Sequence, residues 1–95
     1  MFSIIIKNSE IIKNSKEVSD LLKQRLNLLL DSEFIKILDS IIFDSIEQSY
    51  YIDNNEPDKI KIYFSDKVLK ELVMPGKGIF LFDEILLKTE RELIR

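Results

Sequence analysis

The segment from Phe34 to Tyr50 carries apolar side chains so densely that it limits the fold more than any other part of this chain. Projected as a helix at about 100° per residue, its apolar side chains cover well over half of the circumference. A surface helix buries one apolar stripe, so a helix of this kind needs burial on more than one side. Its apolar residues are Phe34, Ile35, Ile37, Leu38, Ile41, Ile42, Phe43, Ile46 and Tyr50, and its polar strip is Glu33, Lys36, Ser40, Asp44 and Glu47.

The preceding segment has the spacing of an amphipathic helix, with apolar residues every three or four positions from Val18 to Leu30. Asn14 or Ser15 is a suitable N-cap, and Asp31 or Ser32 can cap the next segment. We therefore expect a helical hairpin of residues 16–30 and 33–51. The excess apolar surface of the second helix indicates that it is central in the fold or lies at a homodimer interface.

Three other segments have the character of strands. In residues 59–65 the apolar Ile60, Ile62 and Phe64 alternate with more polar positions, which is typical of a half-buried strand. Residues 2–7 and the short apolar run at 78–82 also favour extended structure. We expect these three segments to form a small sheet on which the helices pack.

The remaining residues complete an α+β fold. Ser65 can cap a short helix over residues 66–74, which Pro75 and Gly76 would end. The spacing of charged and leucine residues predicts a helix at 84–95, with a hairpin strand as the alternative. Ninety-five residues fit a single domain, residues 1–95.

The side-chain inventory disfavours an enzyme. The chain has no cysteine and no histidine, so thiolate chemistry and the commonest general base and metal ligand are absent. None of its nine serines lies in an S-x-x-K motif. The acidic loop after Ile52 fails the calcium-loop template, because Pro57 and Asp58 stand at its fifth and sixth positions. We therefore expect no catalytic residues, no cofactor and no bound metal.

The glycine-containing stretch "VMPGKGIFLF" (residues 73–82) is not a phosphate loop. A P-loop requires G-x-x-x-x-G-K-[ST] between a strand and a helix, and neither the spacing nor the predicted elements fit. Pro75 and Gly76 suit the centre of a type II turn. The longest apolar run has four residues, from Ile79 to Phe82, whereas a membrane span needs about 20. We expect a cytoplasmic protein without membrane contact.

Charge is concentrated in the middle of the chain. Residues 31–58 carry one basic and eight acidic residues, a net charge of −7 within a protein of net charge −3. No basic block is available to replace the counterions of DNA or RNA, so direct nucleic-acid binding is disfavoured. An acidic surface is suited to a protein partner with a basic surface. The candidate partner-binding residues are Glu33, Asp44, Glu47, Asp53, Glu56 and Asp58.

Arg25 is unusual because helical spacing places it in the middle of an apolar arc of leucines. A buried, unpaired charge costs several kcal/mol, so a buried Arg25 requires a carboxylate, for which Asp39 is the candidate. The alternative is an Arg25 that extends along the edge of the core with its charge in water.

Two functions follow as hypotheses. The first is a small acidic binding module that blocks a basic surface of a host protein, as inhibitors from phages and other mobile elements do, anti-CRISPR proteins among them. No motif of the chain assigns it to one of their families. The second is a structural or assembly subunit that forms a homo-oligomer through the second helix.

Overall fold

The computed structural model describes residues 2–74 and 79–94. Its strands are β1 (Ser3–Ile6), β2 (Leu38–Asp44), β3 (Tyr50–Asp53) and β4 (Ile60–Ser65). They form one mixed sheet in the order β1-β2-β4-β3, in which β1, β2 and β4 are parallel and β3 is antiparallel to β4. The helices are α1 (Ser15–Leu29), α2 (Ser32–Ile37), α3 (Asp66–Leu72) and α4 (Ile79–Leu93), and a 3-10 turn η1 spans Ser9–Ile11.

Local chemistry fixes where several helices begin. The carboxylate of Asp31 accepts a hydrogen bond from the backbone N–H of Glu33 at 2.8 Å, and the hydroxyl of Ser65 accepts one from that of Lys67 at 3.1 Å. Both are N-cap bonds that satisfy a free donor in the first turn. Asn14 precedes α1 with φ of 59°, in the left-handed region that asparagine tolerates better than most residues.

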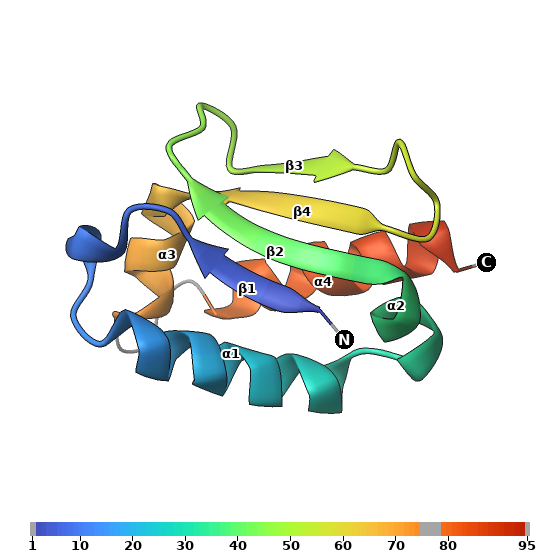
Figure 1. Cartoon of the computed structure of the whole chain (residues 1–95), viewed down its shortest axis with the longest axis horizontal. Coiled ribbons are helices and arrows are strands. Elements are labelled where there is room, and N and C mark those ends of the chain that lie inside the picture. Colours follow the sequence, from blue (N-terminus) through green and yellow to red (C-terminus); the bar gives the residue numbers. More distant parts are fainter. Residues whose placement is uncertain (1, 75–78, 95) are drawn as a thin grey trace.

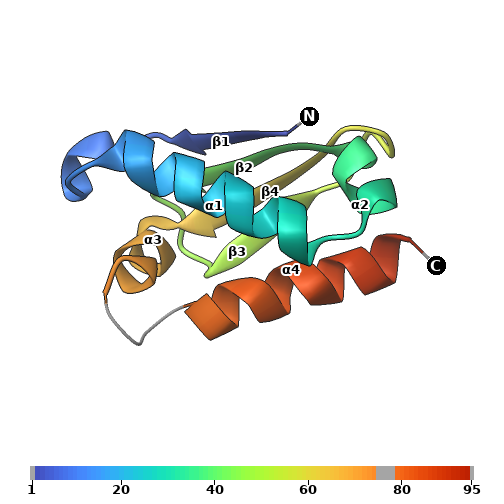
Figure 2. The same ribbon diagram turned by 90° about the horizontal axis from the view of Figure 1, so that it is seen from below.

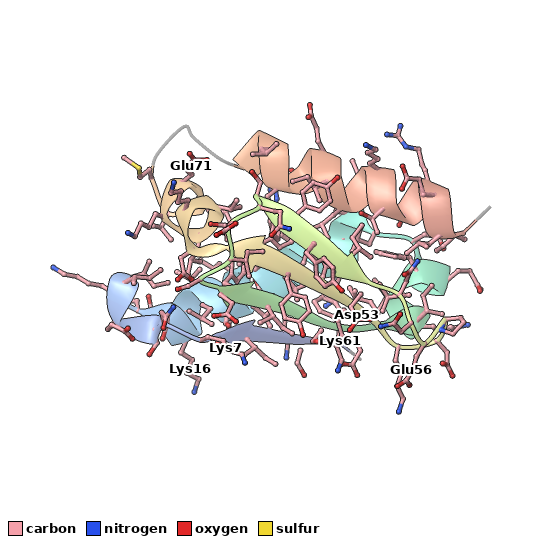
Figure 3. All side chains as sticks on the ribbon, turned by 90° about the horizontal axis from the view of Figure 1, so that it is seen from above. Lys7, Lys16, Asp53, Glu56, Lys61 and Glu71 are labelled. Carbon is pink, nitrogen blue, oxygen red and sulfur yellow. The ribbon has the colours of Figure 1, made fainter. Side chains whose placement is uncertain are left out.

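The fold has two layers. The helices lie on one face of the sheet, with α1 and α4 side by side beneath the strands (Figures 1 and 2). Within the described residues, no helix covers the opposite face (Figures 1 and 3). We call this uncovered surface the open face. It is a consequence of placing every helix on the same side of the sheet.

The centre of the core is a cluster of three phenylalanines between the sheet and α4. Phe43 of β2, Phe64 of β4 and Phe82 of α4 are fully buried. Their ring centroids are 5.6 Å apart for Phe43 and Phe64, 6.1 Å for Phe43 and Phe82, and 4.9 Å for Phe64 and Phe82. These separations are typical of favourable aromatic pairs, so the cluster holds α4 against the strands.

The predicted helix at residues 33–51 is wrong. The segment forms the short helix α2, then the strand β2, and later the strand β3. β2 lies between β1 and β4 and is covered by helices on one face, which explains the near-continuous burial of Ile41, Ile42 and Phe43. The helical hairpin is therefore absent. The second long helix, which was predicted to form the dimer interface, does not exist.

The predicted strand at residues 78–82 is also wrong, because Ile79–Leu93 is helical. Phe82, Ile85, Leu86 and Thr89 are all buried, and this spacing of three and four residues places them on one side of α4. The helix predicted at 84–95 is confirmed, with an earlier start, and its strand alternative is wrong. The predicted turn at Pro75 and Gly76 lies outside the described residues.

Several expectations are confirmed. The fold is α+β with helices packed on a sheet. The predicted strands 2–7 and 59–65 correspond to β1 and β4, and the predicted helices 16–30 and 66–74 correspond to α1 and α3.

Candidate functional site

The open face carries an apolar row that crosses all four strands. Ile5 of β1 is in register with Ile42 of β2, Ile42 with Tyr63 of β4, and Tyr63 with Tyr51 of β3. Because side chains of a strand alternate between its two faces, these four residues point to the same side. They form a band from one edge of the sheet to the other, which we call the Ile-Tyr row.

The Ile-Tyr row lies outside the main core. Ile42 is 5% exposed but does not belong to the core cluster, so its neighbours on the open face bury it. Tyr51 is 50% exposed, and its ring centroid is 5.7 Å from that of Tyr63 at an interplanar angle of 52°. The tilted pair forms an aromatic platform at the β3 edge.

A polar row runs parallel to the Ile-Tyr row. Ser3, Ser40, Lys61 and Asp53 are in register across the four strands. Figure 3 looks onto this face and shows Lys61 and Asp53 at the end of the sheet near Glu56, and Lys7 on the β1 side. The apolar band is thus flanked by charged groups of both signs.

The six acidic residues predicted to bind a partner fall into two groups at opposite ends of the sheet. Asp44 and Glu47 lie at or after the end of β2, in the connection to β3. Asp53 and the loop residues Glu56 and Asp58 lie at the other end, between β3 and β4, and Glu33 of α2 lies at this end below the sheet (Figure 1). The fold therefore brings Asp53, Glu56 and Asp58 together and separates them from Asp44 and Glu47.

Two of the six acidic residues form salt bridges with a lysine three residues further along the chain. Glu33 lies 3.7 Å from the Nζ of Lys36, and Glu56 lies 4.0 Å from that of Lys59. All four side chains are exposed, so these ion pairs contribute little and can be exchanged for contacts with a partner. Asp53 accepts a hydrogen bond from the backbone N–H of Asn55 at 3.2 Å, which orders the start of the acidic loop.

Arg25 pairs with Asp83 of α4, and the prediction of Asp39 as its partner is wrong. Its Nη2 bonds to Asp83 Oδ2, and its Nε donates to Oδ1 at 3.2 Å. This two-pronged hydrogen bond raises the pKa of Arg25 above its ordinary value. Asp39 is exposed at an irregularity of β2 and accepts a hydrogen bond from the hydroxyl of Ser40. The Arg25 side chain is 45% exposed, in agreement with a place at the edge of the core.

Replacing Arg25 by Met should have a small effect on stability. We expect Arg25→Met to change the free energy of unfolding by no more than about 1 kcal/mol, because solvent screens a half-exposed ion pair. Urea denaturation at low protein concentration measures the change. A loss of several kcal/mol would mean that the pair behaves as a buried one.

A polar cluster lies where the three parallel strands end. Asn8 follows β1, Ser45 follows β2 and Asp66 follows β4. The Nδ2 of Asn8 donates to Ser45 Oγ at 2.9 Å and to Asp66 Oδ2 at 2.7 Å, and Ser45 Oγ donates to the same oxygen at 2.9 Å. The other oxygen of Asp66, Oδ1, is buried without a hydrogen-bond partner. The cluster joins three strand ends and has a clear structural role.

Within residues 2–74 and 79–94, no group of three or more acidic side chains is arranged to hold a metal ion. In the same part of the chain, no helix is both long and apolar enough to cross a membrane. Comparisons with protein-family models, curated proteins and solved structures gave no match. The candidate site is therefore defined by the geometry of the open face alone.

Sequence reasoning missed the apolar half of this site. The acidic residues were found from charge, whereas Ile5, Ile42, Tyr51 and Tyr63 were not selected. One signal was present, because Tyr63 stands among the solvent-facing positions of the alternating strand 59–65. An aromatic residue at such a position indicates a contact surface.

Proposed function

We propose that this protein acts by binding another protein through its open face. The observation that carries the proposal is the Ile-Tyr row, which crosses every strand on the side of the sheet that the helices leave uncovered. Protein interfaces combine an apolar or aromatic centre with a polar rim, and tyrosine is enriched among the residues that contribute most to affinity.

The acidic groups at the two ends of the sheet support a basic partner. Asp44 and Glu47 at one end, and Asp53, Glu56 and Asp58 at the other, bracket the Ile-Tyr row, and Lys7, Lys59 and Lys61 offset part of their charge. This excess of negative charge at the rim favours a partner with lysine or arginine side chains around an apolar contact, and it accelerates association. An arginine of the partner could also stack on the Tyr51 ring.

Occupying a basic surface of another protein would block that surface. We therefore propose inhibition by steric occlusion as the mode of action, in the manner of a phage or mobile-element protein that acts on a host protein. The lack of histidine and cysteine supports binding over catalysis.

The test compares the proteins captured from native host cells by matched variants. Tyr51→Ala removes the exposed ring, and the paired charge reversal Glu47→Lys and Asp53→Lys alters both ends of the rim. We expect each change to weaken the affinity for the captured partner at least tenfold, about 1.4 kcal/mol. The charge reversals should also slow association and reduce its dependence on salt.

Lys88→Ser is the control, because Lys88 is an exposed residue of α4, on the side of the sheet away from the open face. It should capture the same partner with unchanged affinity. Circular dichroism confirms that each variant is folded. If the open-face variants retain the partner at full affinity, the proposed function is wrong.

A further inference from the structure

Within the described residues, the strand β3 has one edge with which no other strand pairs. The strand order places β3 beyond β4, and Figure 1 shows it as the outermost strand. The sequence of β3, Tyr-Tyr-Ile-Asp, contains no proline or lysine, and its register with β4 has no bulge. These are features that commonly keep a further strand from pairing with an edge. The free edge of β3 is therefore open to strand addition.

The register shows which backbone groups point away from β4. Ser49 is opposite Ser65, and the N–H of Ser65 donates to the C=O of Ser49 at 3.0 Å. In an antiparallel pair, hydrogen-bonded and non-hydrogen-bonded residue pairs alternate, so Tyr51 is bonded to β4 whereas Tyr50 and Ile52 are not. The N–H and C=O groups of Tyr50 and Ile52 point outward, and within residues 2–74 and 79–94 they have no hydrogen-bond partner.

We propose that the partner adds an extended segment to this edge as a further strand of the sheet. This inference rests on the proposed function and names how the partner is held. The outward N–H and C=O groups of Tyr50 and Ile52 are matched best by another extended backbone, which supplies acceptors and donors at the same spacing. Because side chains of a strand alternate between its faces, every second residue of the added segment lies beside Tyr51 and extends the Ile-Tyr row.

The charges around β3 specify a basic segment. Residues 44–58, which include β3 and the connections on either side of it, carry five acidic residues and no basic residue. Glu47 precedes the strand, and Glu56 and Asp58 follow it. An apolar extended segment with lysine or arginine at both ends complements this arrangement. The β3 edge of a second copy does not, because it would bring a second set of the same acidic residues against the first.

Hydrogen exchange of the complete chain tests this arrangement, first without a ligand. The amides of Tyr50 and Ile52 should exchange at least tenfold faster than those of Tyr51 and Asp53, which donate to β4. The probe is the synthetic peptide acetyl-Lys-Lys-Val-Thr-Val-Thr-Lys-Lys-amide. At about ten times its dissociation constant, the probe should slow exchange at Tyr50 and Ile52 about tenfold, because only the free edge exchanges.

Two altered probes separate the contributions of backbone and charge. N-methylation of the four central residues removes their N–H donors and should weaken binding at least tenfold. Replacing the four lysines by glutamate should have an effect of similar size, because the acidic residues around β3 then repel the peptide. In the protein, Glu47→Gln combined with Glu56→Gln should weaken binding of the basic probe severalfold. The control Glu84→Gln, an exposed position of α4, should leave it unchanged.

Three results would overturn strand addition at β3. The first is unchanged exchange at Tyr50 and Ile52 with the basic probe, or protection of the β1 edge in their place. The second is equal affinity for the basic and the N-methylated probes. The third is protection that rises with protein concentration alone, which would show that a second copy pairs with the edge. If the edge stays unprotected while Tyr51→Ala still loses the captured partner, strand addition fails and the proposed function stands.

Discussion

Phe82→Ala should lower the free energy of unfolding by about 3–5 kcal/mol, the largest effect expected of a single substitution in this protein. Phe82 is fully buried, stacks on Phe43 and packs against Phe64 with its ring tilted. Removing its ring leaves a cavity between α4 and the sheet and removes two aromatic contacts. Small domains have total stabilities of about 5–15 kcal/mol, so much of the margin would be lost. Urea or guanidinium unfolding followed by circular dichroism measures the change.

Leu81→Ala is the matched control, because Leu81 is the adjacent residue of the same helix and is partly exposed. A surface substitution of this kind changes stability by no more than about 0.5 kcal/mol. Equal losses for the two variants would show that α4 does not pack on the sheet through Phe82. The comparison therefore tests whether α4 buries Phe82 against the sheet and exposes Leu81.

Asp66→Ala should cost about 2 kcal/mol, because it removes the acceptor shared by Asn8 and Ser45. Asn8→Ala removes two donated hydrogen bonds of the same cluster and should cost a similar amount. The two substitutions disrupt one network, so the double variant should lose less stability than the two single losses together. Denaturation of the four proteins of this double-mutant cycle gives the coupling energy.

Asp66→Asn separates the loss of hydrogen bonds from the loss of charge. The amide retains one oxygen that can accept from Asn8 and Ser45, so we expect a smaller loss than for Asp66→Ala. Strictly additive losses in the cycle would mean that the three strand ends are held independently. The Oδ1 atom of Asp66 is buried without a hydrogen-bond partner. This is compatible with a role in joining the strand ends, because the hydrogen bonds that Oδ2 accepts stabilise the same side chain.

Local pattern was enough to predict part of this fold. The alternation of Ile60, Ile62 and Phe64 identifies β4, and the spacing of Val18, Leu22 and Leu26 identifies α1. In both cases one face is buried and the other is not, so the period of the apolar residues reveals the element. The acidic half of the candidate site was predictable for a similar reason, because charge is a property of each residue.

The segment 33–51 shows where this reasoning fails. A segment with so many apolar residues can be a helix that is buried on most sides or a strand that is buried on both faces. The periodicity of the apolar residues alone does not distinguish the two. β2 is a strand because β1 and β4 lie on either side of it, and both partners are distant in the sequence. Burial of Ile42 on the open face depends on the same neighbours.

By itself, the sequence determined the α+β class, the strands β1 and β4, the helices α1 and α3, a C-terminal helix and the acidic character of the middle of the chain. The tertiary structure alone decided the strand β2, the pairing of Arg25 with Asp83, and the alignment of Ile5, Ile42, Tyr63 and Tyr51 into one row. The physical reason is that periodicity and charge are local along the chain. Strand register and the choice of the covered face depend on contacts between segments that are far apart in sequence.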